Sequence, residues 1–361
     1  MAAYIVRRFF QGLVVLFLST FLIYSILIIT PGGPRDQIRA LTESGEIINP
    51  DLIRLLEKQY GLDKPYPLSY SLWLFDPEDT TKVTYTIQGD VLTAPKGINL
   101  FGIIQGSGIL TGDMGESISI DQGKSVVALM GDRLGNTLTL MGLSTLLSIL
   151  IAIPIGIISA IRQYSRLDYT VTAFSFLGLS MPTFWLGLML IIVFAILPQQ
   201  LHNAGLTWLP YLPTGDTGDS TIDRVYHLVL PVLVLSFVGI AGLSRYVRAS
   251  MLEVLRQDYV RTAWSKGLSH RAIILRHALR NALVPVITII TLGLPDLFGG
   301  AIITETVFNY FGMGKLFFEA VSVLDFPLVM GFLLINVVLI VTANVVADML
   351  YAAADPRIRF T

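Results

Sequence analysis

Long apolar stretches dominate the pattern of hydrophobic and polar positions along the chain. Six of them are apolar over about the 20 residues that a helix needs to cross the hydrocarbon core of a bilayer. Glycine and proline occur within them, as membrane helices tolerate. The pattern predicts an all-α polytopic membrane protein whose six transmembrane helices cover residues 9–30, 136–160, 170–197, 227–246, 281–305 and 328–351.

The composition agrees with this pattern. Of the 361 residues, 53% are hydrophobic and only 14% are charged, against about 25% charged residues in an ordinary soluble domain. This excludes a soluble enzyme of normal surface and a disordered chain, which needs low hydrophobicity and high charge. The net charge of −1 gives no sign of nucleic-acid binding, and the lack of cysteine excludes disulfides and thiolate metal sites.

The distribution of lysine and arginine predicts the orientation. Cytoplasmic loops are rich in basic residues, and placing the N-terminus inside puts 14 of the 25 basic residues in inside segments with only four acidic ones. We therefore expect both termini in the cytoplasm, with residues 352–361 as a cytoplasmic tail. Eight of the 14 lie in the single inside stretch 245–280.

The first outside loop, residues 31–135, is too long for a simple connector and is expected to have structure of its own. Leucines recur at helical spacing from Leu52 to Tyr60. Val83, Tyr85 and Ile87 alternate with polar residues before a predicted turn at 88–90. The loop is thus predicted to form a small mixed α/β domain on the outer face, either a packing lid or a docking surface for an external partner.

The inside stretch 245–280 contains a short amphipathic pattern. Residues 258–266 predict about two turns of helix. We expect Gly267 to end this helix and Ser269 to cap the next one. The apolar side of the helix is predicted to hold Tyr259, Val260, Ala263 and Trp264. Three interpretations remain open: a solvated basic loop, an interfacial helix on anionic lipid, or a docking helix for a soluble partner.

A transporter needs an energy source, but the chain has no recognisable nucleotide site. Gly123-Lys124-Ser125 resembles the end of a phosphate-binding loop, yet the required first glycine is replaced by Ile118, and the segment lies in the outside loop. We expect no cofactor on this chain and no ATPase activity of its own.

Two other function classes have weaker support. Asp296, next to Pro295 in a predicted kinked fifth span, is the kind of intramembrane acid that ion-coupled carriers use, although it also suits a structural hydrogen bond. Ser269-His270 would be the best nucleophile pair of a membrane hydrolase, but no Gly-x-Ser-x-Gly elbow occurs.

Several ordered motifs make the chain resemble a permease subunit of ATP-binding-cassette (ABC) importers, of the first permease type in the dipeptide/oligopeptide class. In the inside loop, Arg261-Thr262-Ala263 takes the place of the family's Glu-Ala-Ala, and Gly267 fits the family's glycine. His277 and Arg280 depart from the general pattern but are similar to the peptide subclass. Further matching motifs begin at Pro31, Tyr60, Gly112, Arg133, Glu305, Gly312 and Asp355, whereas residues 76–111 look like an insertion.

The resemblance implies a type I importer permease fold in a bacterial or archaeal cytoplasmic membrane. It implies a second homologous permease subunit, two cytoplasmic ATPase subunits that bind ATP and magnesium, an external substrate-binding protein, and a peptide as cargo. It also implies that the 258–267 helix couples ATP hydrolysis to the spans. The residues expected at the coupling site are Asp258, Tyr259, Arg261, Thr262, Ala263, Trp264, Lys266, Gly267 and Leu268, and the candidates for the substrate pathway are Ser180, Met181, Asp296 and Asn336.

Overall fold

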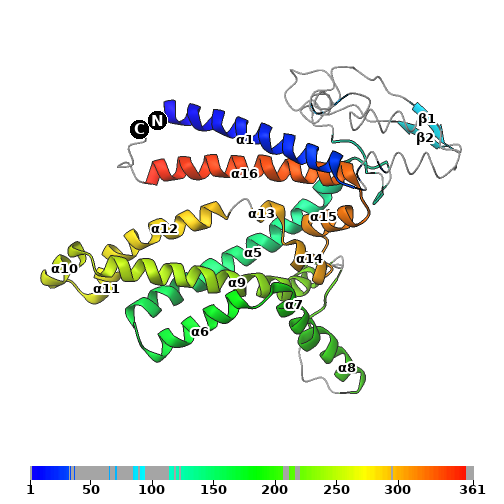
Figure 1. Cartoon of the computed structure of the whole chain (residues 1–361). Coiled ribbons are helices and arrows are strands. Elements are labelled where there is room, and N and C mark those ends of the chain that lie inside the picture. Colours follow the sequence, from blue (N-terminus) through cyan, green and yellow to red (C-terminus); the bar gives the residue numbers. More distant parts are fainter. Residues whose placement is uncertain are drawn as a thin grey trace. The chain divides into compact units, whose positions relative to one another are not determined.

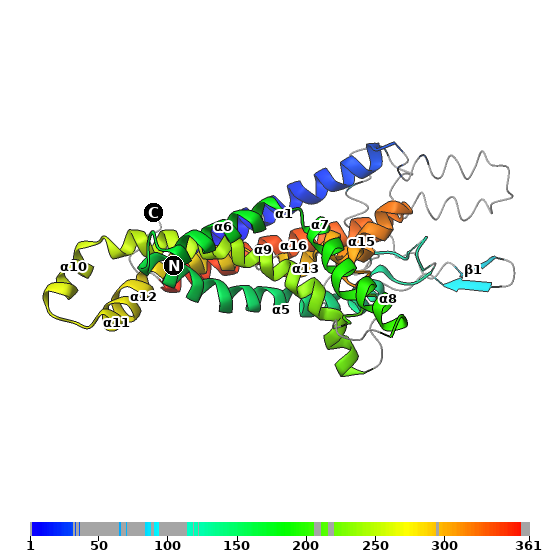
Figure 2. The same cartoon turned by 90° about the horizontal axis from the view of Figure 1, so that it is seen from below.

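The protein was analysed as a computed structural model of the whole chain (Figure 1; Figure 2 gives a second view). Its helices and strands are described for residues 2–31, 33, 36, 65, 70, 84–87, 90–93, 114–117, 119–121, 123–205, 211–215, 220–293 and 296–354. The helix predicted around Leu52 to Tyr60 and the tail from residue 355 lie outside these residues. The chain divides into two compact units, one formed by Met1–Arg133 and Leu316–Val345, the other by Leu134–Lys315 and Val346–Arg359.

The described residues are mostly helical, which confirms the predicted all-α membrane architecture. Five helical stretches are long and apolar enough to cross a membrane: Val126–Ile161, Thr183–Asn203, Ile222–Leu255, His270–Gly299 and Phe326–Val346. Helix α1 (Ala2–Ile29) contains a shorter apolar stretch, Phe10–Ile26. The count of six spans therefore stays a prediction.

In the first unit, α1 lies beside α16 (Phe326–Ala354), as Figure 1 shows. The two helices approach closely, because a β-carbon placed on Gly12 would lie 3.0 Å from Val341 Cγ1. Tyr70, from the long loop, packs against α1, and its hydroxyl is hydrogen-bonded to Thr20 Oγ1 at 2.7 Å. This contact fixes one point of the loop on the first helix.

The same loop contains an antiparallel hairpin of β1 (Thr84–Ile87) and β2 (Asp90–Thr93). In its register Thr84 pairs with Thr93 and Ile87 with Asp90. The hairpin lies where alternation predicted a strand and a turn. The mixed α/β domain as a whole, from 31 to 135, stays a prediction.

Asp325 is a second anchor in the first unit. Its buried carboxylate precedes α16 and accepts hydrogen bonds from Ser117 Oγ at 2.5 Å and from the amides of Ser119 and Ile120 at 3.1 and 3.2 Å. It thereby ties the loop that precedes α5 to the start of α16.

The second unit is built around α9 (Thr221–Leu255). Helices α6 (Arg166–Ser180) and α12 (Leu279–Leu292) both pack along it, as does α5 (Val126–Ile161). α5 and α9 are longer than the predicted spans because hydropathy detects only their apolar centres. α5 thus begins ten residues before the predicted span that starts at 136, and Arg245, placed in the predicted loop 245–280, belongs to α9. The domain boundaries stay a prediction.

The predicted third span, 170–197, is wrong as one continuous helix. α6 ends at Ser180 and α7 (Thr183–Ile191) begins after Pro182. Proline has no amide hydrogen and pushes the residue before it out of the helical region, and Met181 is indeed extended, with φ −84° and ψ 122°. The chain continues as a π-helical segment, η2 (Ile192–Ile196), and α8 (Leu197–Asn203).

The predicted fifth span, 281–305, is also interrupted. The helix begins earlier, with α11 (His270–Ala272) and the π-helical η3 (Ile273–Ala278), and α12 ends at Leu292. Two short helices follow, α13 (Asp296–Gly299) and α14 (Ile302–Val307), and α15 (Met313–Ser322) leads toward α16. The predicted kink near the middle of this span is thus confirmed as a break in the helix.

Candidate functional site

Helix α10 (Asp258–Ser265) lies at one end of the second unit, next to α11, in both views (Figures 1 and 2). Asp258 stands in its first turn, where a negative charge is favourable to the helix dipole. The hydroxyls of Thr262 and Ser265 donate to the carbonyls one turn earlier, at 2.9 and 3.2 Å. The predicted short helix is confirmed over these eight residues.

Gly267 ends α10 as predicted, in a Schellman motif. Its φ of +74° is in the left-handed region, which glycine adopts without penalty. The amide of Gly267 donates to the carbonyl of Trp264 at 2.9 Å, and that of Leu268 donates to Ala263 at 3.4 Å. Ser269 then caps the following helix, because its Oγ accepts from the amide of Ala272.

Only two residues of α10 form its buried face. Val260 is 0% and Ala263 is 5% exposed, and both pack against Ile273 of η3. Tyr259 and Trp264, predicted on the same apolar side, flank this pair and are 42% and 45% exposed, so the apolar side is buried only at its centre.

The rest of α10 and the turn after it are exposed and combine aromatic and basic groups, with Tyr259 and Trp264 on either side of the buried pair. Trp264 contacts the ring of His270 edge-on, with the ring centroids 5.2 Å apart. The Tyr259 hydroxyl accepts a hydrogen bond from Asn281 Nδ2 at 2.8 Å. Both aromatics are thus held in place while their outer faces stay accessible. The remaining exposed residues of the predicted coupling site are Asp258, Arg261, Thr262, Lys266, Gly267 and Leu268.

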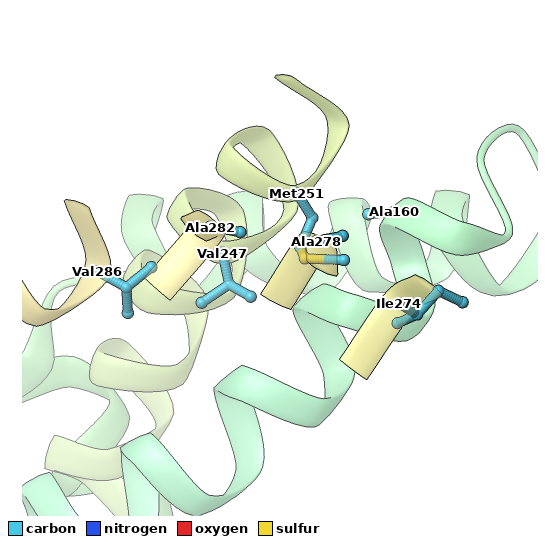
Figure 3. Packing of buried hydrophobic residues seen from close by; sticks show 7 residues of the cluster. All are labelled: Ala160, Val247, Met251, Ile274, Ala278, Ala282 and Val286. Atoms are coloured by element: carbon cyan, nitrogen blue, oxygen red, sulfur yellow. The ribbon is translucent and has the colours of Figure 1, made fainter. Parts of the chain in front are cut away.

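A hydrophobic cluster supports α10 from behind. It joins the ends of α5, α9 and the helix that runs from η3 into α12, as Figure 3 shows. Val254 and Leu255, at the end of α9, pack against both this cluster and the buried face of α10. Close-packed side chains therefore connect α10 to α5, α9 and α12. The cluster consists of Ala160, Val247, Met251, Ile274, Ala278, Ala282 and Val286.

The candidates for the substrate pathway lie on three different elements and stay predictions. Ser180 is exposed at the end of α6, and Met181 is the half-buried residue in the break after it. Asp296 is the first residue of α13. Asn336 belongs to the other unit and donates to the carbonyl of Phe332 in its own helix at 3.0 Å.

The motif from Glu305 to Lys315 forms a buried carboxylate site. Glu305, 0% exposed, accepts hydrogen bonds from Thr137 Oγ1 and from the amide of Lys315, each at 3.0 Å. A β-carbon on Gly300 would lie 2.8 Å from Glu305 Oε1, and one on Gly314 would lie 3.0 Å from Oε2. The glycines of this motif are therefore required because the carboxylate fills the space of a side chain.

Sequence reasoning missed an ion pair between Asp168 and Arg248, which it used only as charges that set the topology. Asp168 is 2% exposed, and its Oδ1 lies 2.6 Å from Arg248 Nε. The Asp168 half of this ion pair has a local sequence signal, because Ser165 stands three residues before Asp168 in the pattern of a helix cap. The partner 80 residues later has none.

The comparisons with known proteins agree with the resemblance drawn from the motifs. A family described as "Binding-protein-dependent transport system inner membrane component" matches residues 152–360, and its N-terminal companion, "Binding-prot-dependent transport system membrane comp, N-term", matches residues 1–83.

Full-length relatives point the same way. The oligopeptide transport system permease protein AppB of Bacillus subtilis (strain 168) is 38% identical over 362 residues, and the dipeptide transport system permease protein DppB of Alkalihalophilus pseudofirmus is 33% identical over 380 residues. In both cases all of this chain and all of the relative are covered. Among solved structures, a chain of the inward-facing MetNI methionine ABC transporter aligns with 63% of this chain and 97% of its own, at 18% identity and a TM-score of 0.46. The chain belongs to the family of binding-protein-dependent transport system inner membrane components.

Proposed function

We propose that this chain is a membrane-spanning permease subunit of an ATP-driven importer that translocates peptides delivered by an external binding protein. Family membership and five apolar helices make it a multi-pass membrane protein of a transport system. The peptide cargo is supported by full-length relatives that are named for oligopeptide and dipeptide transport.

The observation that carries the coupling part of this proposal is the two-sided build of α10. Its buried side is fixed by Val260 and Ala263, while Tyr259 and Trp264 present aromatic surface outward. An exposed, well-held aromatic surface on a short helix suits insertion into a groove of a soluble partner. We assign this partner as a cytoplasmic ATPase subunit.

The rest of the assembly follows from what a single permease subunit lacks. We propose a second, homologous permease subunit, two ATPase subunits that hold ATP and magnesium, and a binding protein that meets the outer face. We place the complex in the cytoplasmic membrane with both termini inside.

The segment that resembles a phosphate-binding loop is a surface charge cluster. In it, Lys124 Nζ contacts Asp132 at 3.0 Å and Asp121 at 3.7 Å.

Two other functions are not favoured. An ion-coupled carrier that depends on Asp296 has no support from the relatives, which are named as peptide permeases. A hydrolase that uses Ser269 has little basis, because this side chain caps a helix by accepting the amide of Ala272.

The test of the docking role is Ala263→Asp in the complete complex. A carboxylate at this buried position would be placed against Ile273 without a partner of opposite charge within α10's buried cluster. We expect the variant to insert normally, to lose its ATPase subunits during purification, and to lose ATP-driven peptide uptake. Ala263→Ser, which keeps a small side chain, is the control and should retain both. Normal uptake by Ala263→Asp would show that α10 is not the docking helix.

A further inference from the structure

One buried carboxylate joins three helical segments on the α10 side of the second unit. Asp168 Oδ1 accepts from Arg248 Nε at 2.6 Å and from Ser159 Oγ at 2.5 Å. Its Oδ2 accepts from Arg248 Nη2 at 2.8 Å and from the amide of Tyr164 at 2.9 Å. The Arg248 guanidinium thus forms a bidentate ion pair with both oxygens of Asp168, a geometry that adds specificity to charged hydrogen bonds.

The donors come from α9, from the end of α5 and from the turn between α5 and α6. Ser159 is in the last turn of α5, and Tyr164 is in the turn between α5 and α6, where its φ is +63°. Asp168 is in the first turn of α6, and its amide donates to Ser165 Oγ at 3.2 Å. Arg248 is in α9, two turns before that helix ends and leads into α10. The side chain of Asp168 therefore connects the α5–α6 turn directly to the helix that carries α10.

The seam between α6 and α9 continues from this pair through small residues. Ser175 Oγ and Ser244 Oγ lie 3.2 Å apart, and both side chains are buried. A β-carbon on Gly178 would lie 2.7 Å from that of Ala241. The two helices are thus in backbone-level contact over several turns, with the ion pair at one end of the seam.

The chemistry of the Asp168–Arg248 ion pair suits a contact that holds α6 and α9 in one alignment. A buried ion pair contributes little net stability compared with apolar packing, but separating its members leaves buried charge unpaired. Apolar side chains slide past one another more readily than a two-pronged ion pair, which is satisfied in one arrangement only. α6 is therefore held to α9 in a fixed register at the point nearest α10.

We propose that Asp168 and Arg248 are positioning residues of the import cycle: their ion pair makes α6 and the α5–α6 turn move together with α9 when α10 is displaced. This inference rests on the proposed docking role of α10. It assigns the path by which motion reaches α6 from α9, the helix that leads into α10.

Cysteine cross-linking tests whether α6 and α9 move as one body. The chain has no cysteine, so Ser175→Cys with Ser244→Cys introduces a single cysteine pair into it, at positions whose side-chain oxygens lie 3.2 Å apart. The experiment uses the complete importer in proteoliposomes, oxidised with a membrane-permeant catalyst, and measures peptide uptake and the extent of cross-linking. We expect uptake to stay within about twofold of the reduced sample after the pair has closed. Uptake that is lost on oxidation and restored by reductant would overturn the proposal, as would a pair that does not oxidise.

A second variant removes the Asp168–Arg248 ion pair and leaves helices α6 and α9 in place. Arg248→Met should lower the number of peptides imported per ATP hydrolysed at least fivefold in complexes that retain their ATPase subunits. Closing the 175–244 disulfide in this background should restore the ratio, and reduction should abolish it again. A ratio equal to that of the parent, or one that the disulfide does not restore, would contradict the proposal. If the parent chain itself does not retain ATPase subunits, the proposed function fails instead.

Discussion

The turn at Gly267 allows the role of α10 to be tested by a graded series of substitutions. Gly267 has a φ of +74°, and nothing lies within 4 Å of a β-carbon placed on it. The β-carbon of alanine, asparagine or valine would therefore meet no neighbouring residue of this chain. The main effect expected of alanine is on the backbone conformation of the turn.

The expected magnitude follows from the left-handed conformation. An L-residue other than glycine pays about 1–2 kcal/mol to adopt it, and asparagine pays less because its side chain makes local hydrogen bonds. A free-energy difference of this size corresponds to a factor of about 5–30 in an equilibrium constant. Molecules in which the turn at Gly267 takes another conformation also lose the Schellman hydrogen bonds to Trp264 and Ala263. In these molecules α10 is no longer positioned to bind the ATPase subunit.

The assay is the affinity of the purified ATPase subunits for the permease in lipid nanodiscs at fixed salt. Apparent affinity falls with the fraction of permease in the competent conformation. We expect Gly267→Ala to weaken binding by up to about 5–30-fold, Gly267→Val at least as strongly, and Gly267→Asn to lie between alanine and the parent.

Gly131→Ala is the matched control. Gly131 is in α5, has open space around a β-carbon and no positive φ, so this variant should bind like the parent. The reasoning would be refuted if Gly267→Ala bound normally, or if asparagine at this position weakened binding more than alanine does.

Three further predictions concern stability in detergent. Gly312→Ala places a β-carbon against the Glu305 carboxylate and should lower unfolding stability by about 1–3 kcal/mol, visible as a lower thermal midpoint, whereas Gly135→Ala, with open space, should not. Tyr70→Phe removes the hydrogen bond to Thr20 and should lower stability by about 1 kcal/mol; an unchanged midpoint would show that this hydrogen bond does not hold the loop. The hydrogen bonds from Arg248 hold the pKa of Asp168 below its usual value despite burial, so the contribution of the pair is complete above about pH 4–5 and is lost only as the pH falls further. The stability difference between the parent and Asp168→Asn should thus be constant from about pH 5 to 8 and shrink in more acidic buffer, and a change between about pH 6 and 8 would contradict this.

The local features of α10 were predictable because local rules determine them. Gly267 acts through its own backbone and the residues just before it, and Ser269 acts through its hydroxyl on the amide three residues later. The structure places both as the sequence predicted. Which apolar residues of α10 are buried and which are exposed was not predictable in the same way. Tyr259 and Val260 are adjacent on the helix, and only the position of Ile273 determines which of them is buried.

The helix breaks were harder to predict from hydropathy. The stretch around Met181 and Pro182 is continuously apolar, so the scale gives one span where proline geometry gives two helices. The break after Leu292 was anticipated because proline and glycine cluster there with an acid.

Long-range polar contacts had no sequence signal at all. Glu305 meets Thr137, and Asp168 meets Arg248, across separations of 168 and 80 residues. The motif of glycines around Glu305 was visible, but the reason for it is the carboxylate that fills their missing side chains. A single sequence does not show which distant residues are in contact, so such pairs can be identified only from the structure.

The central claim is that this chain imports peptides as the permease part of an ATP-driven complex. Its most direct test is uptake of labelled peptide into proteoliposomes that contain the chain with its cognate permease and ATPase subunits, binding protein outside and ATP inside. We predict uptake that requires both ATP and the binding protein and that Ala263→Asp abolishes. Uptake by the purified chain alone, driven by an ion gradient without ATP, would contradict the account.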